Sequence, residues 1–251
     1  MNGAVFFLAV NFVVAACFSA VFAVVATRSR SRRAALWLAA GFGVASLSAI
    51  CELLVAFSPF PKAAAIGAFA TVLVGMVLLR AGIGELYGRP IDRRGAIAFV
   101  TASVLVNYLI YGLPRGTPVQ AFAYQTPFAL VVLWSAFAVV SSRRRLMVDR
   151  FLGGVMLFTG LHFFAKAGLA VLVGSGTTAK DYIHTNYALI SQSATAVLMV
   201  AVGLTLLAVL VLEIMADQQS DAEKDALSGL ANRRGFERQV QLVLAEKATK
   251  P

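Results

Sequence analysis

Seven long apolar runs constrain this chain more than any other feature of its sequence. About 20 residues of helix cross the roughly 30 Å of hydrocarbon in a bilayer. Lipid offers backbone groups no hydrogen-bond partner, so a crossing segment must be a helix or part of a closed barrel. These runs lack the period-two alternation of barrel strands and are about twice too long for them. We therefore predict an all-α membrane protein, a bundle of seven transmembrane helices. The runs cover approximately residues 4–26, 34–57, 63–83, 95–112, 121–140, 151–173 and 187–212.

The composition agrees with this fold class and argues against a nucleic-acid partner. Hydrophobic residues make up 59% of the chain and charged residues only 14%, whereas soluble domains rarely exceed about half apolar residues. The formal net charge is +10, but the arginines stand in short clusters between the runs and not on one face of a soluble element. The lipid bilayer is the partner that this pattern predicts, and no His, Cys and carboxylate cluster has the spacing of a metal site.

The basic clusters alternate along the chain and predict its orientation. Connections after the first, third and fifth runs are rich in arginine, and the others hold one basic residue each. The rich set comprises Arg28, Arg30, Arg32, Arg33, Arg80, Arg89, Arg93, Arg94, Arg143, Arg144, Arg145 and Arg150; the poor set comprises Lys62, Arg115 and Lys180. By the positive-inside rule we expect the N-terminus outside and the C-terminus in the cytoplasm.

The chain changes character at Glu213, where the last apolar run passes into a polar segment without a glycine or proline. We predict a transmembrane domain over 1–212, a short helical linker over 213–224 and the start of another domain over 225–251. The helix should continue to about Ser220 and a turn should follow at 227–229. An amphipathic stretch after the turn has Phe236 and Val240 on one face, which needs a partner to cover it.

The segment 225–236, DALSGLANRRGF, resembles the opening of GGDEF domains, the diguanylate cyclase family, which reads D-x-L-T-G-L-x-N-R-R-x-F. The matching residues are Asp225, Leu227, Ser228, Gly229, Leu230, Asn232, Arg233, Arg234 and Phe236. Ser228 stands where the family has threonine, which keeps the hydroxyl. The resemblance covers only about residues 225–245.

The resemblance implies a membrane-bound cyclase that makes cyclic di-GMP from GTP with Mg²⁺, working as a homodimer at the bacterial inner membrane. It implies a structural role for Asp225 with Arg233 or Arg234, at the junction of signalling helix and cyclase domain. The family's Gly-Gly-[Asp/Glu]-Glu-Phe sequence does not occur here. We therefore assign no catalytic residue, expect no cyclic di-GMP synthesis by these 251 residues alone, and expect them to be part of a longer open reading frame.

Polar residues inside the runs gather at one depth. With the expected orientation they fall in the outer halves of the helices, and the inner halves hold no ionisable residue before the arginine-rich boundary. We predict that they line a cavity for an unknown small ligand: Asn11, Glu52, Asn107, His162, Lys166 and Gln192. Glu52 could pair with Lys166, because their depths differ by only about 4 Å. The alternatives are that these groups tie helices together, or that the charged ones snorkel to the interface.

Two classes of function compete. The first is a sensory input module that passes a signal through the last helix to a cytoplasmic GGDEF domain. The alternative is a small-solute transporter or channel, which predicts polar residues at both depths and interrupted helices, whereas we expect dry inner halves and spans without an internal proline. A receptor that acts through a separate partner protein is a third possibility.

Overall fold

The computed structural model describes residues 3–144, 146–223, 232, 236 and 240. Seven helices in these ranges are long and apolar enough to cross a membrane, which confirms the prediction of a seven-helix, multi-pass bundle. No strand occurs in the described ranges. The helices are α1 (Gly3–Val25), α2 (Arg32–Phe57), α3 (Pro61–Leu86), α4 (Arg93–Ile110), α5 (Pro118–Val140), α6 (Met147–Val173) and α7 (Asn186–Ala222), with a short 3₁₀ helix η1 (Tyr182–His184) before α7.

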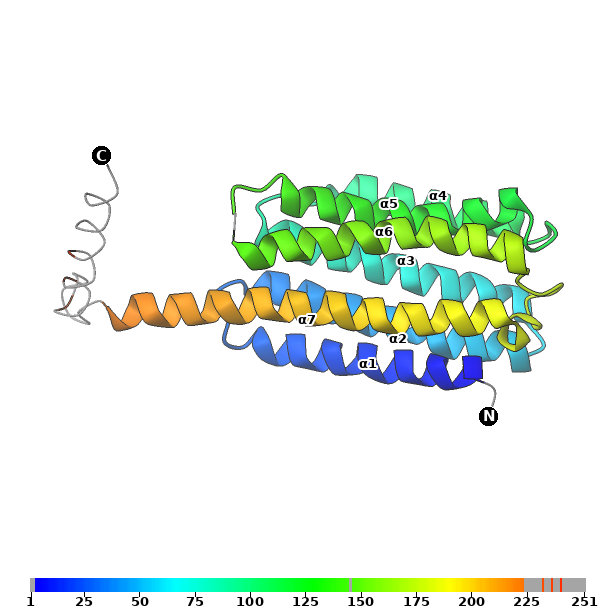
Figure 1. Cartoon of the computed structure of the whole chain (residues 1–251), viewed down its shortest axis with the longest axis horizontal. Coiled ribbons are helices and arrows are strands. Elements are labelled where there is room, and N and C mark those ends of the chain that lie inside the picture. The colour runs from blue at the N-terminus through cyan, green and yellow to red at the C-terminus, as the bar shows by residue number, and fades with distance from the viewer. Residues whose placement is uncertain (1–2, 145, 224–231, 233–235, 237–239, 241–251) are drawn as a thin grey trace.

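Six of the helices pack in a ring, and the remaining helix, α4, lies outside it. Each helix of the ring contacts the next in the order α1, α2, α3, α5, α6, α7, and α7 contacts α1 again. Among these main pairings α4 packs only against α3 and α5. The loops at 26–31, 87–92 and 141–144 share one end of the bundle, which we call the arginine end. The loops at 58–60, 111–117 and 174–185 share the other, which we call the distal end. At the arginine end α7 projects well beyond the other helices (Figure 1).

Local sequence explains where several helices begin. Pro61 and Pro118 occupy the first turns of α3 and α5, where the missing N–H would have no partner in any case. Asp92 caps α4 by accepting from the backbone N–H of Gly95 at 2.9 Å. Pro127 lies inside α5, which our expectation of spans without an internal proline did not foresee, although α5 is assigned as one continuous helix.

Two helices are longer at the arginine end than the sequence predicted. Helix α6 begins at Met147, and α3 continues to Leu86. Arg80, which lies near the end of the predicted third run and was counted with its arginine-rich boundary, is inside α3 with only 2% of its surface exposed. Its guanidinium lies 4.6 Å from the centre of the Trp134 ring and donates to the backbone oxygen of Arg89 at 3.1 Å. The arginine-rich boundary that the sequence predicts therefore extends into the buried end of α3.

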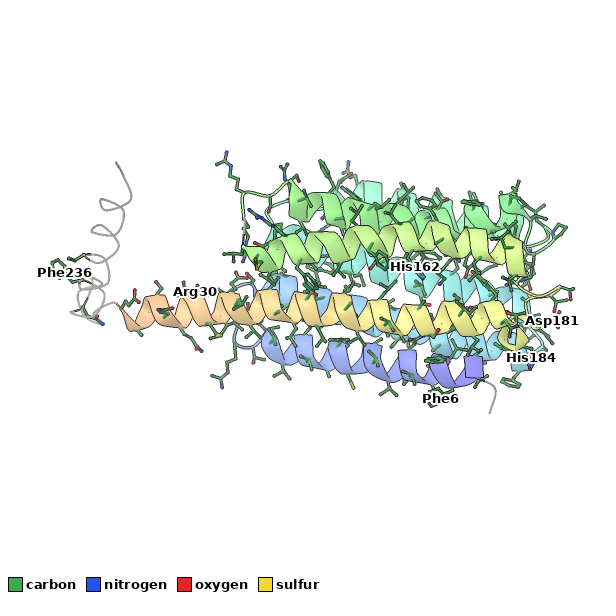
Figure 2. All side chains as sticks on the ribbon, in the orientation of Figure 1. Phe6, Arg30, His162, Asp181, His184 and Phe236 are labelled. Carbon is green, nitrogen blue, oxygen red and sulfur yellow. The ribbon has the colours of Figure 1, made fainter. Side chains whose placement is uncertain are left out.

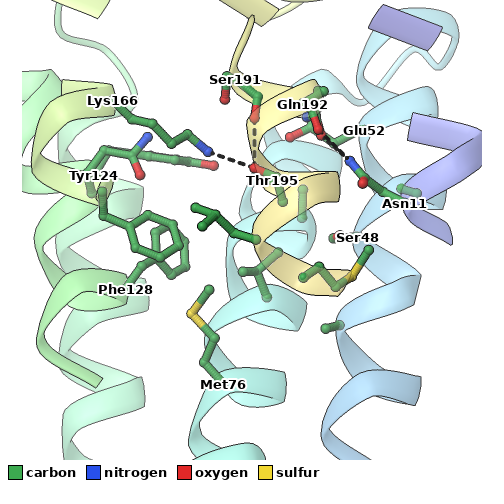
Figure 3. A pocket seen from close by; sticks show the side chains of 18 of the residues that line it. Asn11, Ser48, Glu52, Met76, Tyr124, Phe128, Lys166, Ser191, Gln192 and Thr195 are labelled. Carbon is green, nitrogen blue, oxygen red and sulfur yellow. Dashed lines mark hydrogen bonds between the residues drawn. The ribbon is translucent and has the colours of Figure 1, made fainter. Parts of the chain in front are cut away.

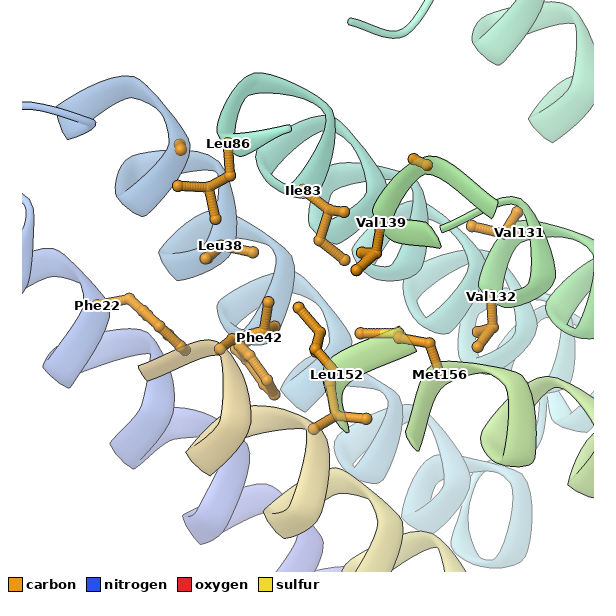
Figure 4. Packing of buried hydrophobic residues seen from close by; sticks show 14 of the residues in the cluster. Phe22, Leu38, Phe42, Ile83, Leu86, Val131, Val132, Val139, Leu152 and Met156 are labelled. Carbon is orange, nitrogen blue, oxygen red and sulfur yellow. The ribbon is translucent and has the colours of Figure 1, made fainter. Parts of the chain in front are cut away.

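The half of the bundle nearer the arginine end is closely packed. Phe22 and Phe42 stack with their ring centres 5.5 Å apart, and Leu38, Leu152 and Met156 belong to the same buried cluster (Figure 4). Glycines allow α2 and α3 to approach each other: a Cβ added to Gly75 would lie 2.7 Å from the backbone oxygen of Gly41. Small residues at such crossings are the usual basis of helix association in lipid.

Helix α7 is continuous from Asn186 to Ala222, which confirms the predicted helical exit past Glu213. Six residues, which we call the clasp, hold this exit against the loops: Arg30, Ser31, Arg144, Glu213, Asp217 and Asp221. Arg30 lies beside the projecting part of α7 (Figure 2). It donates to both carboxylate oxygens of Asp221 at 2.9 Å and lies 3.4 Å from Asp217. The hydrogen bond to Asp221 and the charge of Asp217 raise the pKa of Arg30 above its usual value.

The second part of the clasp is centred on Glu213. The Ser31 hydroxyl donates to its carboxylate at 2.6 Å, and Arg144 lies 3.8 Å from it. A buried hydrogen bond lies nearby, from the Tyr87 hydroxyl to Asp149 at 2.7 Å. Burial, and then the bond to Asp149, raise the pKa of Tyr87, so its phenol remains a donor. The projecting helix is thus tied to the loops between α1 and α2 and between α5 and α6.

The predicted turn at 227–229 and most of the 225–236 motif lie outside the described residues. Asn232 is described, and it contacts the end of α7. Its side-chain amide donates to the backbone oxygen of Ala222 at 2.8 Å, and its backbone N–H donates to the oxygen of Glu223 at 2.9 Å. The motif's asparagine therefore satisfies carbonyl groups that a helix C-terminus leaves unpaired.

Candidate ligand cavity

A cavity of about 280 Å³ lies between the helices of the bundle. All six residues that the sequence singled out line it: Asn11, Glu52, Asn107, His162, Lys166 and Gln192. They come from five helices, α1, α2, α4, α6 and α7. Asn107 is buried and reaches the cavity from α4, outside the ring. The six residues therefore line one common cavity, and the binding of a ligand there stays a prediction.

Hydrogen bonds link several of these side chains across helices. Asn11 on α1 donates through Nδ2 to the side-chain oxygen of Gln192 on α7 at 2.9 Å. Gln192 in turn donates to the Tyr182 hydroxyl at 3.1 Å. On another wall, Gln125 of α5 donates to the Tyr187 hydroxyl at 3.3 Å. These bonds also tie helices together, so the interhelical role that we considered as an alternative holds for the amides.

The two charged residues of the cavity do not form the pair that similar depth suggested. Lys166 donates to the Thr195 hydroxyl at 3.4 Å, and Thr195 donates to the backbone oxygen of Ser191 at 2.8 Å. The salt bridges among described residues do not include one between Glu52 and Lys166. The two side chains lie on different walls with α7 between them (Figure 3). The depth of a residue gives its position along the bundle axis but not the direction in which its side chain points around that axis. Similar depth was therefore not enough to predict an ion pair.

Three polar atoms of the cavity wall are buried without a hydrogen-bond partner among the described residues. They are Oδ1 of Asn11, Oε1 of Gln125 and Nε2 of His162. A buried polar atom without a partner is costly, and most such atoms in folded proteins are satisfied. Each of the three belongs to a side chain that lines the cavity, so a bound molecule could satisfy it.

The deeper part of the cavity is apolar. Met76 and Phe128 lie below the polar groups in the close view (Figure 3). Phe128 packs with its ring centre 4.9 Å from that of Phe69 and 5.6 Å from that of Phe163. Met156 and Ile83 line the cavity still nearer the arginine end. The cavity therefore combines a polar upper part with an apolar floor.

The distal loops form the mouth of the cavity. Arg115, Ser175, Ala179 and Tyr182 line it from the loops at 111–117 and 174–185. Arg115 donates to the backbone oxygen of Ser175 at 3.3 Å and lies 5.8 Å from the centre of the Tyr182 ring. Sequence reasoning did not include these residues, because nothing in a polar loop indicates which of its side chains turns back over the bundle.

The loop from 174 to 185 is held by Asp181. Its carboxylate accepts from the Thr177 hydroxyl at 2.6 Å and from the hydroxyl and backbone N–H of Thr178 at 2.8 Å. These bonds lower the pKa of Asp181 to about 2. Gly174 and Gly176 have φ values of 82° and 88°, which a residue with a side chain rarely adopts. The loop is thus shaped by its own short-range bonds.

Comparisons with protein-family models, with curated proteins and with solved structures found no match for this chain.

Proposed function

We propose that this chain is the membrane-embedded sensory module of a diguanylate cyclase. A ligand in the cavity biases the position of α7, and α7 passes that bias to a cytoplasmic GGDEF domain that begins at 225–236. That domain would make cyclic di-GMP from GTP with Mg²⁺ in a homodimer at the bacterial inner membrane. The supporting observation is that α7 is one continuous helix with cavity residues near one end and clasp residues near the other.

The coupling needs only a modest energy difference. A ligand shifts an equilibrium between two positions of α7 by its difference in affinity for them. Gln192 and Thr195 lie on α7 and line the cavity, so a molecule there contacts the moving element directly. Twenty-odd residues further along the same helix, Asp217 and Asp221 are held by one arginine at the surface, and such exposed pairs exchange partners at little cost.

The transporter alternative finds less support in the geometry. Alternating access requires a site that opens to both sides of the membrane. The described residues that line this cavity include loop residues of the distal end and none from the loops at 26–31, 87–92 or 141–144. Phe22, Leu38 and Leu152, which belong to the packed cluster toward the arginine end, do not line the cavity either.

A fusion protein tests the proposal. Residues 1–236 are joined, at the shared motif, to the remainder of an active GGDEF domain, and cyclic di-GMP is measured in cells by mass spectrometry. We expect Glu52→Gln and Lys166→Met to alter the output without changing membrane insertion. Gln218 is exposed on the projecting part of α7. Gln218→Pro, which breaks the helix, should remove the effect of both cavity variants, whereas the control Gln218→Ala should retain it. Equal output from all variants would contradict the proposal.

The orientation needs a separate test. Single cysteines replace Thr178 in the distal loop and Thr27 at the arginine end, in a chain whose Cys17 and Cys51 are alanine. A membrane-impermeant thiol reagent should label position 178 in intact spheroplasts and position 27 only after lysis. The reverse pattern would place the cavity mouth in the cytoplasm.

A further inference from the structure

The cavity bears opposite charges on different walls. Glu52 contributes a carboxylate from α2 and Lys166 an ammonium from α6. Glu52 interacts electrostatically with Arg115 at the distal loops and, more weakly, with Lys166, yet among the described residues it forms no ion pair with either. Lys166 makes one long hydrogen bond, to Thr195 at 3.4 Å, and lies 5.4 Å from the centre of the Phe163 ring. Charges held apart inside a membrane protein are costly unless something of opposite charge lies between them.

The uncharged amide of Asn11 adds to the difference between the Glu52 wall and the Lys166 wall. Asn11 comes from α1, which packs against α2, and lines the same cavity as Glu52; its Oδ1 is a buried acceptor with no donor among the described residues. The Glu52 wall therefore offers a carboxylate and an amide oxygen, both of which accept hydrogen bonds. The opposite wall offers the Lys166 ammonium, which only donates. A molecule with an ammonium group and a carboxylate would match both walls at once.

The apolar floor adds a third requirement. Below the charged groups the cavity is lined by Met76 and Phe128, and further down by Val132, Met156 and Val202. A small, fully polar zwitterion would leave this surface uncovered. The mouth lies among the distal loops, so the molecule can enter from water and need not partition from lipid. Ligand sites of this kind commonly combine mostly apolar walls with a few placed polar groups.

We infer that the cavity binds a zwitterionic amino acid with a large apolar side chain. Its ammonium lies against Glu52 and Asn11, its carboxylate against Lys166, and its side chain points down toward Met76 and Phe128. The assignment deepens the proposed sensory function by naming the class of ligand. It concerns binding alone, so it can fail while the coupling of α7 to a cyclase stands, and the reverse.

Direct binding to the purified 251-residue chain in lipid nanodiscs tests the inference. Leucine, isoleucine, methionine, phenylalanine and tryptophan are titrated by calorimetry, with glycine as the ligand that lacks an apolar side chain. For phenylalanine, 3-phenylpropanoate lacks the ammonium and 2-phenylethylamine lacks the carboxylate. We expect at least one of the five to bind. We expect each truncated analogue to bind roughly 10- to 100-fold more weakly, as losing a hydrogen-bonded charge does. Glycine should also bind roughly 10- to 100-fold more weakly, because it covers none of the apolar floor.

Two variants test which charged group of the ligand binds to which wall of the cavity. Glu52→Gln should abolish the preference for phenylalanine over 3-phenylpropanoate and keep the preference over 2-phenylethylamine. Lys166→Met should do the opposite. Glu85→Gln and Lys180→Met change the same residue types at exposed positions that do not line the cavity, and they should bind like the unaltered chain. A purely structural role for Glu52 and Lys166 would weaken all ligands together and would leave both preferences intact.

Three results would overturn the inference. The first is failure of all five amino acids to bind. The second is binding of the truncated analogues as tightly as phenylalanine by the unaltered chain, a comparison that needs no variant and so does not depend on variant folding. The third is a co-purified lipid that native mass spectrometry detects and that the amino acids do not displace.

Discussion

The two halves of the bundle treat polar groups in opposite ways. Toward the arginine end, two ion pairs join loop arginines to α7: Arg30 with Asp221, and Arg144 with Glu213. Toward the distal end, Glu52 and Lys166 face a cavity without forming an ion pair with each other. Packing differs as well, since glycine contacts and stacked rings lie toward the arginine end, whereas the polar part of the cavity lies toward the distal end and only its apolar floor reaches Met156 and Ile83.

This difference indicates a division of labour within one bundle. A packed half resists rearrangement because its interior has no space to accommodate movement. A half with a cavity and unpaired polar groups has stability to gain when a molecule binds there. Helix α7 runs through both halves of the bundle. We expect substitutions in the two halves to have different effects, which the following predictions describe.

The largest effect should come from overpacking the arginine half. A Cβ on Gly75 would lie 2.7 Å from the Cβ of Ala45 and 2.7 Å from the backbone oxygen of Gly41, so Gly75→Val forces α2 and α3 apart. We expect the free energy of unfolding, measured by denaturant titration in mixed micelles, to fall by about 3 kcal/mol. Gly154→Val is the matched control, because no described atom lies within 4 Å of a Cβ there. Equal losses would mean that helix propensity and not packing governs the effect.

A smaller loss should follow removal of the buried hydroxyl of Tyr87. Asp149 is 2% exposed and accepts from this hydroxyl at 2.7 Å, so Tyr87→Phe leaves a buried carboxylate short of a donor. The same titration should show a loss of about 2 kcal/mol. Tyr108→Phe, at a half-exposed tyrosine on α4, should cost almost nothing. If Tyr87→Phe leaves the free energy of unfolding unchanged, the backbone N–H of Leu146, at 3.1 Å, is a sufficient donor for the Asp149 carboxylate.

The clasp should respond to salt, which the packed core does not. Arg30 is exposed, so its bonds to Asp217 and Asp221 are screened by dissolved ions. A spin label at exposed position 219 should become more mobile in Arg30→Ala, and in the unaltered chain as salt is raised from 0.01 to about 1 M. Arg28→Ala, in the same loop, should leave the label's spectrum unchanged. Identical spectra for both variants would mean that the clasp does not hold α7.

The smallest effect concerns the distal loop and acid. The folded pKa of Asp181 is lowered to about 2 from an ordinary value of 3.8. A lowered pKa contributes stability that is complete above the ordinary value and is lost as the pH falls toward about 2. Hydrogen exchange at 177–181 should therefore be slower in the unaltered chain than in Asp181→Asn at pH 6, and the difference should shrink between pH 4 and about 2. A constant difference over that interval would contradict the assignment.

The architecture was readable from sequence because lipid permits so few alternatives. Run length and the absence of alternation predicted seven helices, and the end that was misplaced most is the start of α6 at Met147, where apolar and charged residues mix. The membership of the cavity was also predictable, because a polar side chain such as Asn107 or Lys166 in a hydrocarbon span has few places to go.

What failed were the pairings within the site. Glu52 and Lys166 matched in depth, but their partners depend on how each helix is rotated, which composition does not specify. The bond between Tyr87 and Asp149 joins residues 62 positions apart, and the clasp joins residues nearly 200 apart, so no local pattern announces either one. The orientation across the membrane and the activity of a domain after 225 stay predictions.

One regularity of α7 has a mechanical consequence. Thr195, which accepts from Lys166, and Glu213, which accepts from Ser31, are separated by about five complete turns of an ideal helix. Their side chains therefore leave the axis in the same direction, about 27 Å apart. Twisting α7 by a given angle at the Thr195 level swings the Glu213 carboxylate through the same angle on the same side of the rod. Rotation of α7 about its axis by a fraction of a turn would therefore change the direction in which Glu213 faces Ser31 and Arg144. A shift of α7 along its axis would instead move Glu213 past these two residues without changing the direction in which it points.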